Sequence, residues 1–244
     1  MKVLLVGDSC EDEYIYGNCT RISPEAPVPI LNFNRVETKS GMAGNVCLNL
    51  QAFNLDITFL TNPEKIVKTR FIDEKSNQQI LRVDNEDAVR PLMIPVMTDS
   101  FDAVVISDYN KGYLTTEKIF EIVEGSRCPV FIDSKKSYLP NKSNCFVKIN
   151  DLECSRLSDD CFIDNLIVTK GSGGCFFNNK IYPAEKVKVY DVVGAGDTFL
   201  AALVYGYIST NNIDQALMMG NRGAAIAVQH PGTYVLQEED VQRI

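Results

Sequence analysis

The sequence predicts an α/β protein with a mostly parallel central sheet, and three observations support this fold class. Short apolar runs recur along the chain. Each is followed by a polar or glycine-rich step, which is typical of a buried strand that ends in a loop. Helical patterns, such as residues 115–123, lie between the runs. Alternating strands and helices predict a parallel sheet that is covered on both faces and binds ligands at the carboxyl ends of its strands. The predicted strands are residues 3–6, 103–106, 129–132, 145–149 and 166–168.

Two segments depart from this alternation and predict a small separate sheet. Residues 13–38 are rich in proline and β-branched residues, and within them residues 27–33 read as an extended edge strand. Residues 66–84 alternate around a polar tip and predict a β-hairpin. We expect these segments to form a lid over the open end of one domain that spans residues 1–244. Apolar helices are predicted at residues 199–209 and 213–228.

Composition limits the classes of function. The 244 residues carry 24 basic and 32 acidic side chains, a formal net charge of −8. Nucleic-acid binding rests on clustered Lys and Arg, so no nucleic-acid partner is expected. The eight cysteines are scattered without a C-x-x-C pair, the N-terminus does not resemble a signal peptide, and no apolar run could span a bilayer. We therefore expect free thiols, a cytoplasmic location and no membrane partner.

A glycine loop precedes the first C-terminal helix. Gly194, Ala195 and Gly196 would let backbone N–H groups converge on an anion at a helix N-terminus. Asp197 follows at once and could take the proton of an attacking hydroxyl. Phosphoryl transfer needs both features, because negative charge accumulates on the phosphoryl oxygens. On spacing alone, Asp197 could equally be a helix cap.

Residues 191–199 resemble the C-terminal signature of the ribokinase-like (PfkB) carbohydrate kinase family, D-x-x-G-A-G-D-[TS]-F, at every defined position. The resemblance implies a ribokinase-like three-layer sandwich with a small β-sheet lid. It also implies that ATP and Mg²⁺ are used, and it is compatible with a monovalent cation. In such enzymes the Gly194, Ala195 and Gly196 positions form the anion hole and the Asp197 position is the catalytic base.

Further motifs match the family's metal and nucleotide segments. Asn150 and Glu153 fit its N-x-x-E motif, and oxygen ligands suit a hydrated Mg²⁺. Alternatively, these two residues are a helix cap and its first-turn glutamate. Residues 169–174 resemble the T-x-G-x-x-G nucleotide loop, although a plain hairpin turn would also fit. The residues assigned to nucleotide are Thr169, Lys170, Gly171, Gly174, Asn221 and Gly232.

The N-terminal half resembles the family's sugar-binding segments. Asp8 and Asp12 match the loop whose carboxylates hold sugar hydroxyls. Gly41 and Asn45 match the first signature, in which Met42 replaces the second glycine of the usual pair. These four matching residues are therefore candidate acceptor contacts.

A narrower resemblance, to D-glycero-D-manno-heptose 7-phosphate kinases, rests on residues 20–29, 77–84 and 107–112. It implies transfer to the anomeric hydroxyl in the ADP-heptose and lipopolysaccharide pathway, and is compatible with a homodimer formed through the lid. A phosphorylated acceptor needs cations, although each basic residue alone could be a solvated surface charge. The candidate acceptor residues from these segments are Arg21, Arg82, Asp108 and Lys111.

Two departures from that family are visible. A strand–helix–strand stretch is expected after Asn62 and is missing, and the chain ends at Ile244 without an adenylyltransferase half. Two alternatives therefore stay open: a kinase for another sugar or nucleoside, and a non-catalytic protein that binds a sugar phosphate or a nucleotide.

Overall fold

The computed structural model describes residues 1–85 and 89–244 and contains two sheets. The main sheet has eight strands in the order β12-β11-β10-β9-β8-β7-β1-β4. Its first six strands in the sequence are parallel, and β11 and β12 are antiparallel at one edge. The strands are β1 (Lys2–Gly7), β4 (Asp56–Thr61), β7 (Ala103–Asp108), β8 (Val130–Ser134), β9 (Cys145–Asn150), β10 (Leu166–Thr169), β11 (Cys175–Phe177) and β12 (Lys180–Tyr182). All five predicted strands are confirmed.

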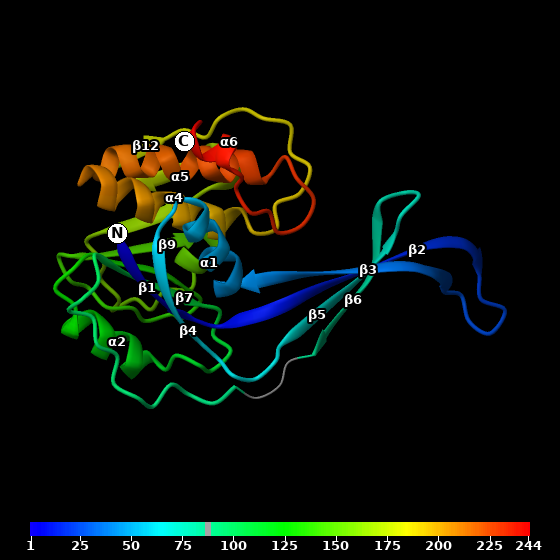
Figure 1. The fold of residues 1–244 in the computed structure, drawn as a ribbon, viewed down its shortest axis with the longest axis horizontal. Helices are drawn as coiled ribbons and strands as arrows, with labels where there is room; N and C mark the ends of the chain where they lie inside the picture. The colour runs from blue at the N-terminus through cyan, green and yellow to red at the C-terminus, as the bar shows by residue number, and fades with distance from the viewer. Residues whose placement is uncertain (86–88) are drawn as a thin grey trace.

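Helices cover both faces of this sheet, so the predicted three-layer arrangement is confirmed (Figure 1). Side chains of β1 show why: Val3 and Leu5 join the core beneath α1, α4 and α5, whereas Leu4 and Val6 join the core beneath α2. The helices are α1 (Ala43–Ala52), α2 (Thr116–Gly125), α3 (Asp151–Cys154), α4 (Ala195–Thr210), α5 (Ile213–Ala227) and α6 (Glu238–Val241), with a 3₁₀ turn at Gly171–Gly173. None of the helices in the described ranges combines the length and apolar character needed to cross a membrane.

The second sheet is the predicted lid, a four-stranded arm that projects from the main body (Figure 1). Its strands are β2 (Ser9–Ile22), β3 (Pro29–Met42), β5 (Val67–Asp73) and β6 (Gln78–Asn85), in the order β3-β2-β5-β6. The edge strand and the hairpin are both confirmed. The lid strands reach closer to the body than the predicted 13–38, because β2 begins two residues after β1 ends.

The connection between β4 and β5 takes the place of the stretch that the sequence lacks. It spans only residues 62–66, and the side chain of Asn62 anchors it. Asn62 Oδ1 accepts a hydrogen bond from the Ser9 backbone N–H at 2.7 Å, and its Nδ2 donates to the Glu64 carbonyl at 2.6 Å. Ile66, the last connecting residue, is almost completely buried. The short connection thus joins the sheet edge to the lid without opening the core.

Met42 replaces the second glycine of the first signature, yet the chain keeps a glycine-like backbone there. Its φ is 55° and its ψ is −134°, a region that residues with a Cβ rarely adopt, and its side chain is buried. Holding this conformation costs on the order of 1–3 kcal/mol. The turn at the start of α1 is therefore retained despite the substitution.

Candidate active site

The carboxyl ends of the parallel strands meet two adjoining cavities. The smaller, of about 190 Å³, is polar and lies between the end of β7 and the start of α4. The larger, of about 450 Å³, lies between the 171–174 loop and the apolar sides of α4 and α5. Three residues line both: Lys148, Asn150 and Gly196. Groups bound in the two cavities would therefore meet at the first turn of α4.

Asp197 stands at this meeting point, buried in the first turn of α4. The helix begins four residues earlier than predicted, because Gly194 adopts a left-handed φ of 77° as its N-cap. The Asp197 carboxylate contacts other elements: Oδ1 accepts from the Tyr109 hydroxyl at 2.6 Å, and Oδ2 accepts from Asn45 Nδ2 at 3.0 Å. Its side chain is therefore directed at the smaller cavity, as a base would be.

Burial raises the pKa of Asp197 to about 6, even though the hydrogen bonds from Tyr109 and Asn45 favour the ionised form. The charge of Asp133 raises this pKa further, and the charge of Lys148 lowers it. A carboxylate with a pKa close to neutrality accepts a proton more readily than one with the ordinary value of 3.8. This environment suits proton abstraction from a hydroxyl.

This pKa predicts how activity depends on pH. Asp197 accepts a proton only when it is ionised, so turnover should be lost as the pH falls through about 6. A plot of log kcat/KM against pH should approach a slope of +1 on its acidic side, with the bend near pH 6. An acidic limb centred near pH 4 would show that Asp197 does not carry this titration.

Lys148 is a site residue that the sequence reasoning missed. It lies on β9 with a side chain that is only 5% exposed, and it forms a 2.5 Å ion pair with Asp133. Burial disfavours its charge, but Asp133, with smaller contributions from Asp197 and Glu153, outweighs this effect and raises the pKa of Lys148 above 10.5. A Cβ on Gly196 would lie 3.0 Å from Lys148 Nζ, so the glycine lets the ammonium approach the loop without being displaced. The feature of the sequence that could have revealed Lys148 is a lysine inside an apolar strand, two residues before Asn150.

Asn150 and Glu153 form a reciprocal capping box at the start of α3. Their contacts are therefore those of a helix cap and its first-turn glutamate, the alternative interpretation of this motif. Asn150 Oδ1 accepts from the Glu153 N–H at 2.9 Å, and Glu153 Oε2 accepts from the Asn150 N–H at 2.9 Å. Both residues also line the smaller cavity, beside Asp133. These oxygen donors fit a Mg²⁺ ion that keeps several of its waters, and within the described residues no three acidic or thiol ligands form a closed metal cluster. Their role as metal ligands stays a prediction.

The 169–174 segment is both a hairpin connection and a wall of the larger cavity. β10 pairs antiparallel with β11 across it, and Thr169, Gly171 and Gly174 line the cavity. Lys170 is exposed and forms an ion pair with Asp151 at 3.3 Å.

Asn221 lines the same cavity, and its Nδ2 donates to the Tyr182 carbonyl at 2.8 Å. Gly232 is placed differently from the prediction. It packs against the Tyr14 ring on the lid side and does not line the larger cavity.

Two predicted acceptor residues instead hold the loop after β7 in place. Asp8 is buried under that loop and accepts backbone hydrogen bonds from Tyr109, Lys111 and Tyr113 at 2.8, 3.2 and 3.3 Å. Asp108 accepts from the Ser134 hydroxyl at 2.5 Å and forms an ion pair with Lys136 at 3.2 Å. Both carboxylates thus position the cavity wall, although Asp108 also lines the cavity.

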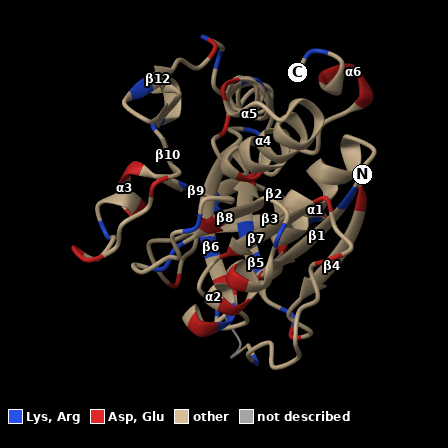
Figure 2. Ribbon diagram, turned by 90° about the vertical axis from the view of Figure 1, so that its left-hand side faces the viewer, with Lys and Arg blue, Asp and Glu red and all other residues tan. Residues whose placement is uncertain are grey.

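One face of the lid, which we call the inner face, is turned toward the site and carries several charges. It consists of Asp12, Tyr14, Lys68, Arg70, Arg82 and Asp84. Strand pairing sets Asp12 beside Lys68, Tyr14 beside Arg70, and Arg70 directly opposite Arg82. Charges of both signs appear on the lid strands and at the adjoining end of the main sheet (Figure 2).

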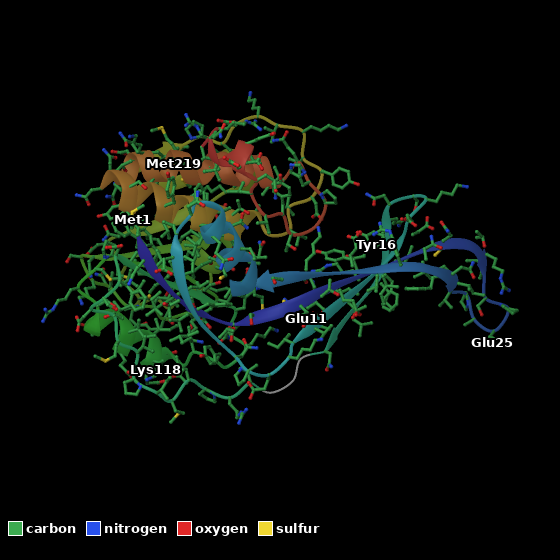
Figure 3. The ribbon with its side chains drawn as sticks, viewed as in Figure 1. Met1, Glu11, Tyr16, Glu25, Lys118 and Met219 are labelled. Carbon is green, nitrogen blue, oxygen red and sulfur yellow. The ribbon has the colours of Figure 1, made fainter. Side chains whose placement is uncertain are left out.

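Of the predicted acceptor residues on the lid, Asp12 is buried in a 2.5 Å ion pair with Arg70, and Gly41 packs against its carboxylate. Arg21 lies near the end of β2, on the part of the lid that leads to the tip where Glu25 is labelled, away from the main body (Figure 3).

Comparison with known proteins finds similar sequences and similar structures. The profile of the pfkB family carbohydrate kinases matches residues 154–240. The bifunctional protein HldE of Nitratiruptor sp. is 30% identical over 296 residues, and that of Campylobacter jejuni strain RM1221 is 30% identical over 294. Each alignment covers 99% of this chain and 64% of the relative, so the chain spans less than two thirds of their length. Both alignments are longer than the 244-residue chain, so the relatives carry extra residues within the aligned region.

Solved structures share the fold. Ribokinase from Thermotoga maritima has a TM-score of 0.72 at 18% identity, covering 99% of this chain and 98% of that one. Phosphofructokinase-2 from Escherichia coli, solved with potassium, has a TM-score of 0.69 at 14% identity, with 99% and 97% covered. The fold is therefore that of the ribokinase-like kinases. The family match takes in the signature loop at residues 191–199, so residues 154–240 are similar to the pfkB family carbohydrate kinases.

Proposed function

We propose that this protein transfers the γ-phosphate of ATP to a phosphorylated sugar, and that its acceptor is the anomeric hydroxyl of D-glycero-D-manno-heptose 7-phosphate. The observation that carries the proposal is the position of Asp197, a buried carboxylate that lines the polar cavity next to Gly196, which lines both cavities. ATP would occupy the larger cavity, and the acceptor would enter the smaller one beneath the lid. This reaction would supply a sugar 1,7-bisphosphate to a nucleotidyl-transfer pathway.

Each group at the site has a role in this reaction. Asp197 takes the proton of the acceptor hydroxyl as its oxygen attacks the γ-phosphorus in line. The N–H groups at the start of α4 and the ammonium of Lys148 stabilise charge on the phosphoryl oxygens. A Mg²⁺ ion near Asn150 and Glu153 would neutralise further charge on the nucleotide. Asn45 holds the other oxygen of Asp197 and so orients the base.

The preference for a phosphorylated acceptor rests on cations around the smaller cavity. Lys68 is half-buried. Burial lowers its pKa, the charge of Asp12 opposes this effect, and the positive charges of Arg82 and Lys135 lower the pKa further. Lys135 lines the cavity itself. Cations that destabilise one another in this way favour a bound anion, and a phosphate held by charged donors gains about 1.5–3 kcal/mol per hydrogen bond. The resemblance at residues 77–84 and 107–112 supports the heptose.

A matched panel of acceptors tests the proposal. The purified chain with Mg-ATP should release ADP with heptose 7-phosphate at a kcat/KM at least tenfold above that with the same heptose lacking the phosphate. Lys135→Met should raise the KM for the phosphorylated acceptor roughly tenfold, the loss of one charge-assisted contact, and leave the KM for ATP unchanged. Lys65→Met, at an exposed lysine that pairs with Glu11, is the matched control.

Two results would overturn parts of the proposal. If no sugar yields ADP above the background of Asp197→Asn, the kinase assignment is wrong and a binding role remains. If ribose, a nucleoside or another sugar without a phosphate is the best acceptor, the kinase assignment stands and the acceptor assignment fails.

A further inference from the structure

Tyr109 occupies an unexpected place at the catalytic base. Its phenolic O–H donates to Asp197 Oδ1 at 2.6 Å, while Asn45 holds the other oxygen. Tyr109 lines the smaller cavity, the space in which the acceptor is proposed to bind. An acceptor hydroxyl must make this kind of hydrogen bond to Asp197 before it can lose its proton. The protein therefore places one of its own hydroxyl groups where the reaction needs the substrate's.

We propose that Tyr109 is a positioning residue that takes the place of the acceptor hydroxyl at Asp197, keeps water off the base until an acceptor arrives, and then swings aside. The inference rests on the proposed kinase function. Its consequence is specificity for the acceptor over water. With Tyr109 in place, no water can pass its proton to Asp197 and attack the γ-phosphorus to release ADP and phosphate.

Tyr109 is suited to this place because it does not react there. Burial, together with the negative charge of Asp197, raises the pKa of Tyr109 well above 10. The pKa of Asp197 is about 6, so the proton stays on the phenol and no phenolate forms to attack ATP. The tyrosine is thus an inert hydroxyl group at the position where a reactive one is needed.

The backbone of Tyr109 is anchored by a hydrogen bond, whereas its ring is held by weaker contacts with cations. Asp8 accepts a hydrogen bond from the Tyr109 backbone N–H at 2.8 Å and anchors the loop. The ring itself is held by cations: the ammonium of Lys135 lies 4.3 Å from its centroid, and that of Lys68, on the lid, lies 5.8 Å away. Each such contact contributes about 0.5–1 kcal/mol.

The same two cations are the proposed ligands of the acceptor's phosphate. An acceptor that draws Lys68 and Lys135 to its phosphate removes them from the Tyr109 ring and weakens the ring's hold on Asp197. Recognition of the distal anion and exposure of the base would thus be coupled through one side chain. A sugar without a phosphate would have to displace Tyr109 without this help.

ADP release without any acceptor tests the inference directly. Tyr109→Phe leaves a space for water beside Asp197, and acceptor-independent hydrolysis of Mg-ATP should rise by roughly tenfold or more, part of the roughly 10²–10⁴-fold that a general base contributes. Tyr138→Phe is the matched control, because Tyr138 is 44% exposed and stacks on Phe120 away from the site. The double variant Tyr109→Phe/Asp197→Asn should return to background. Unchanged or slower hydrolysis in a Tyr109→Phe protein with wild-type thermal stability would overturn the inference.

The pH profile separates displacement from permanent support of the base. The hydrogen bond from Tyr109 stabilises ionised Asp197, so its loss raises the pKa of Asp197. The profile of kcat/KM reports the free enzyme, and that of kcat reports the complex with substrate. If Tyr109 is displaced, Tyr109→Phe shifts the acidic limb of kcat/KM to higher pH and leaves that of kcat in place. A shift of both limbs, or of neither, would overturn displacement. The hydrolysis assay needs no acceptor. It therefore tests the role of Tyr109 even if the proposed acceptor, heptose 7-phosphate, is wrong.

Discussion

Asp197→Asn should lower kcat for phosphoryl transfer by about 10²–10⁴-fold, the contribution of a general base. Asparagine has nearly the same shape, so the backbone of the Gly194–Gly196 loop and the larger cavity should stay intact. The affinity for ATP should therefore change by less than about threefold. Steady-state ADP release and equilibrium binding of a nucleotide analogue measure the two quantities separately.

The matched control is Asp214→Asn on the exposed side of α5, where the carboxylate contacts Lys180 and Tyr182. It makes the same chemical change far from the cavities and should leave kcat unchanged. If Asp197→Asn kept more than a tenth of the wild-type kcat, the acceptor proton would have to go elsewhere. Asp133 would then be the next candidate, because it lines the same cavity.

The main sheet could be predicted from the sequence because its strands are buried on both faces. Such strands appear as uninterrupted apolar runs, and the polar step after each run marks the carboxyl end. The lid was predicted from alternation and proline content, but the predicted segment 13–38 is shorter at both ends than β2 and β3 together. β2 continues from β1 after a single residue, Asp8, and no local pattern separates a strand of the body from a strand of the lid.

The sequence predicted the candidate site best where the residues of a motif lie within a few positions of one another. The loop at residues 194–197 begins a helix beside the cavity, as expected. Residues that depend on distant contacts were harder to interpret: Asp8 resembled a sugar ligand, yet its oxygens accept backbone N–H groups from a loop about one hundred residues later in the chain. Tyr109 lay in a recognised segment, but its contact with Asp197 joins residues 88 positions apart.

The role of Lys148 was harder still to predict, because nothing in the local sequence shows which residue pairs with a lysine inside an apolar strand. In the structure its neighbours are Asp133, on the adjacent strand, and Gly196, in the glycine loop.

Lys148→Met should therefore have two effects. Loss of positive charge where the phosphoryl group passes should lower kcat by about 10²–10³-fold. Leaving Asp133 unpaired should lower the free energy of unfolding by about 3 kcal/mol, the lower end for a broken buried pair, since Asp133 borders a cavity.

A double variant separates the two effects of Lys148. Lys148→Met/Asp133→Leu removes both charges, and replacing a buried pair by apolar residues restores much of the lost stability. Denaturant unfolding should therefore show recovery, whereas ADP release should stay low, because the charge at the start of α4 is still missing. Lys180→Met, at an exposed lysine paired with Asp214, should change neither quantity. If kinase activity returned with stability in the double variant, Lys148 would act only through the fold. Persistent inactivity in a stable protein would show that the charged pair acts in the reaction and not only through the fold.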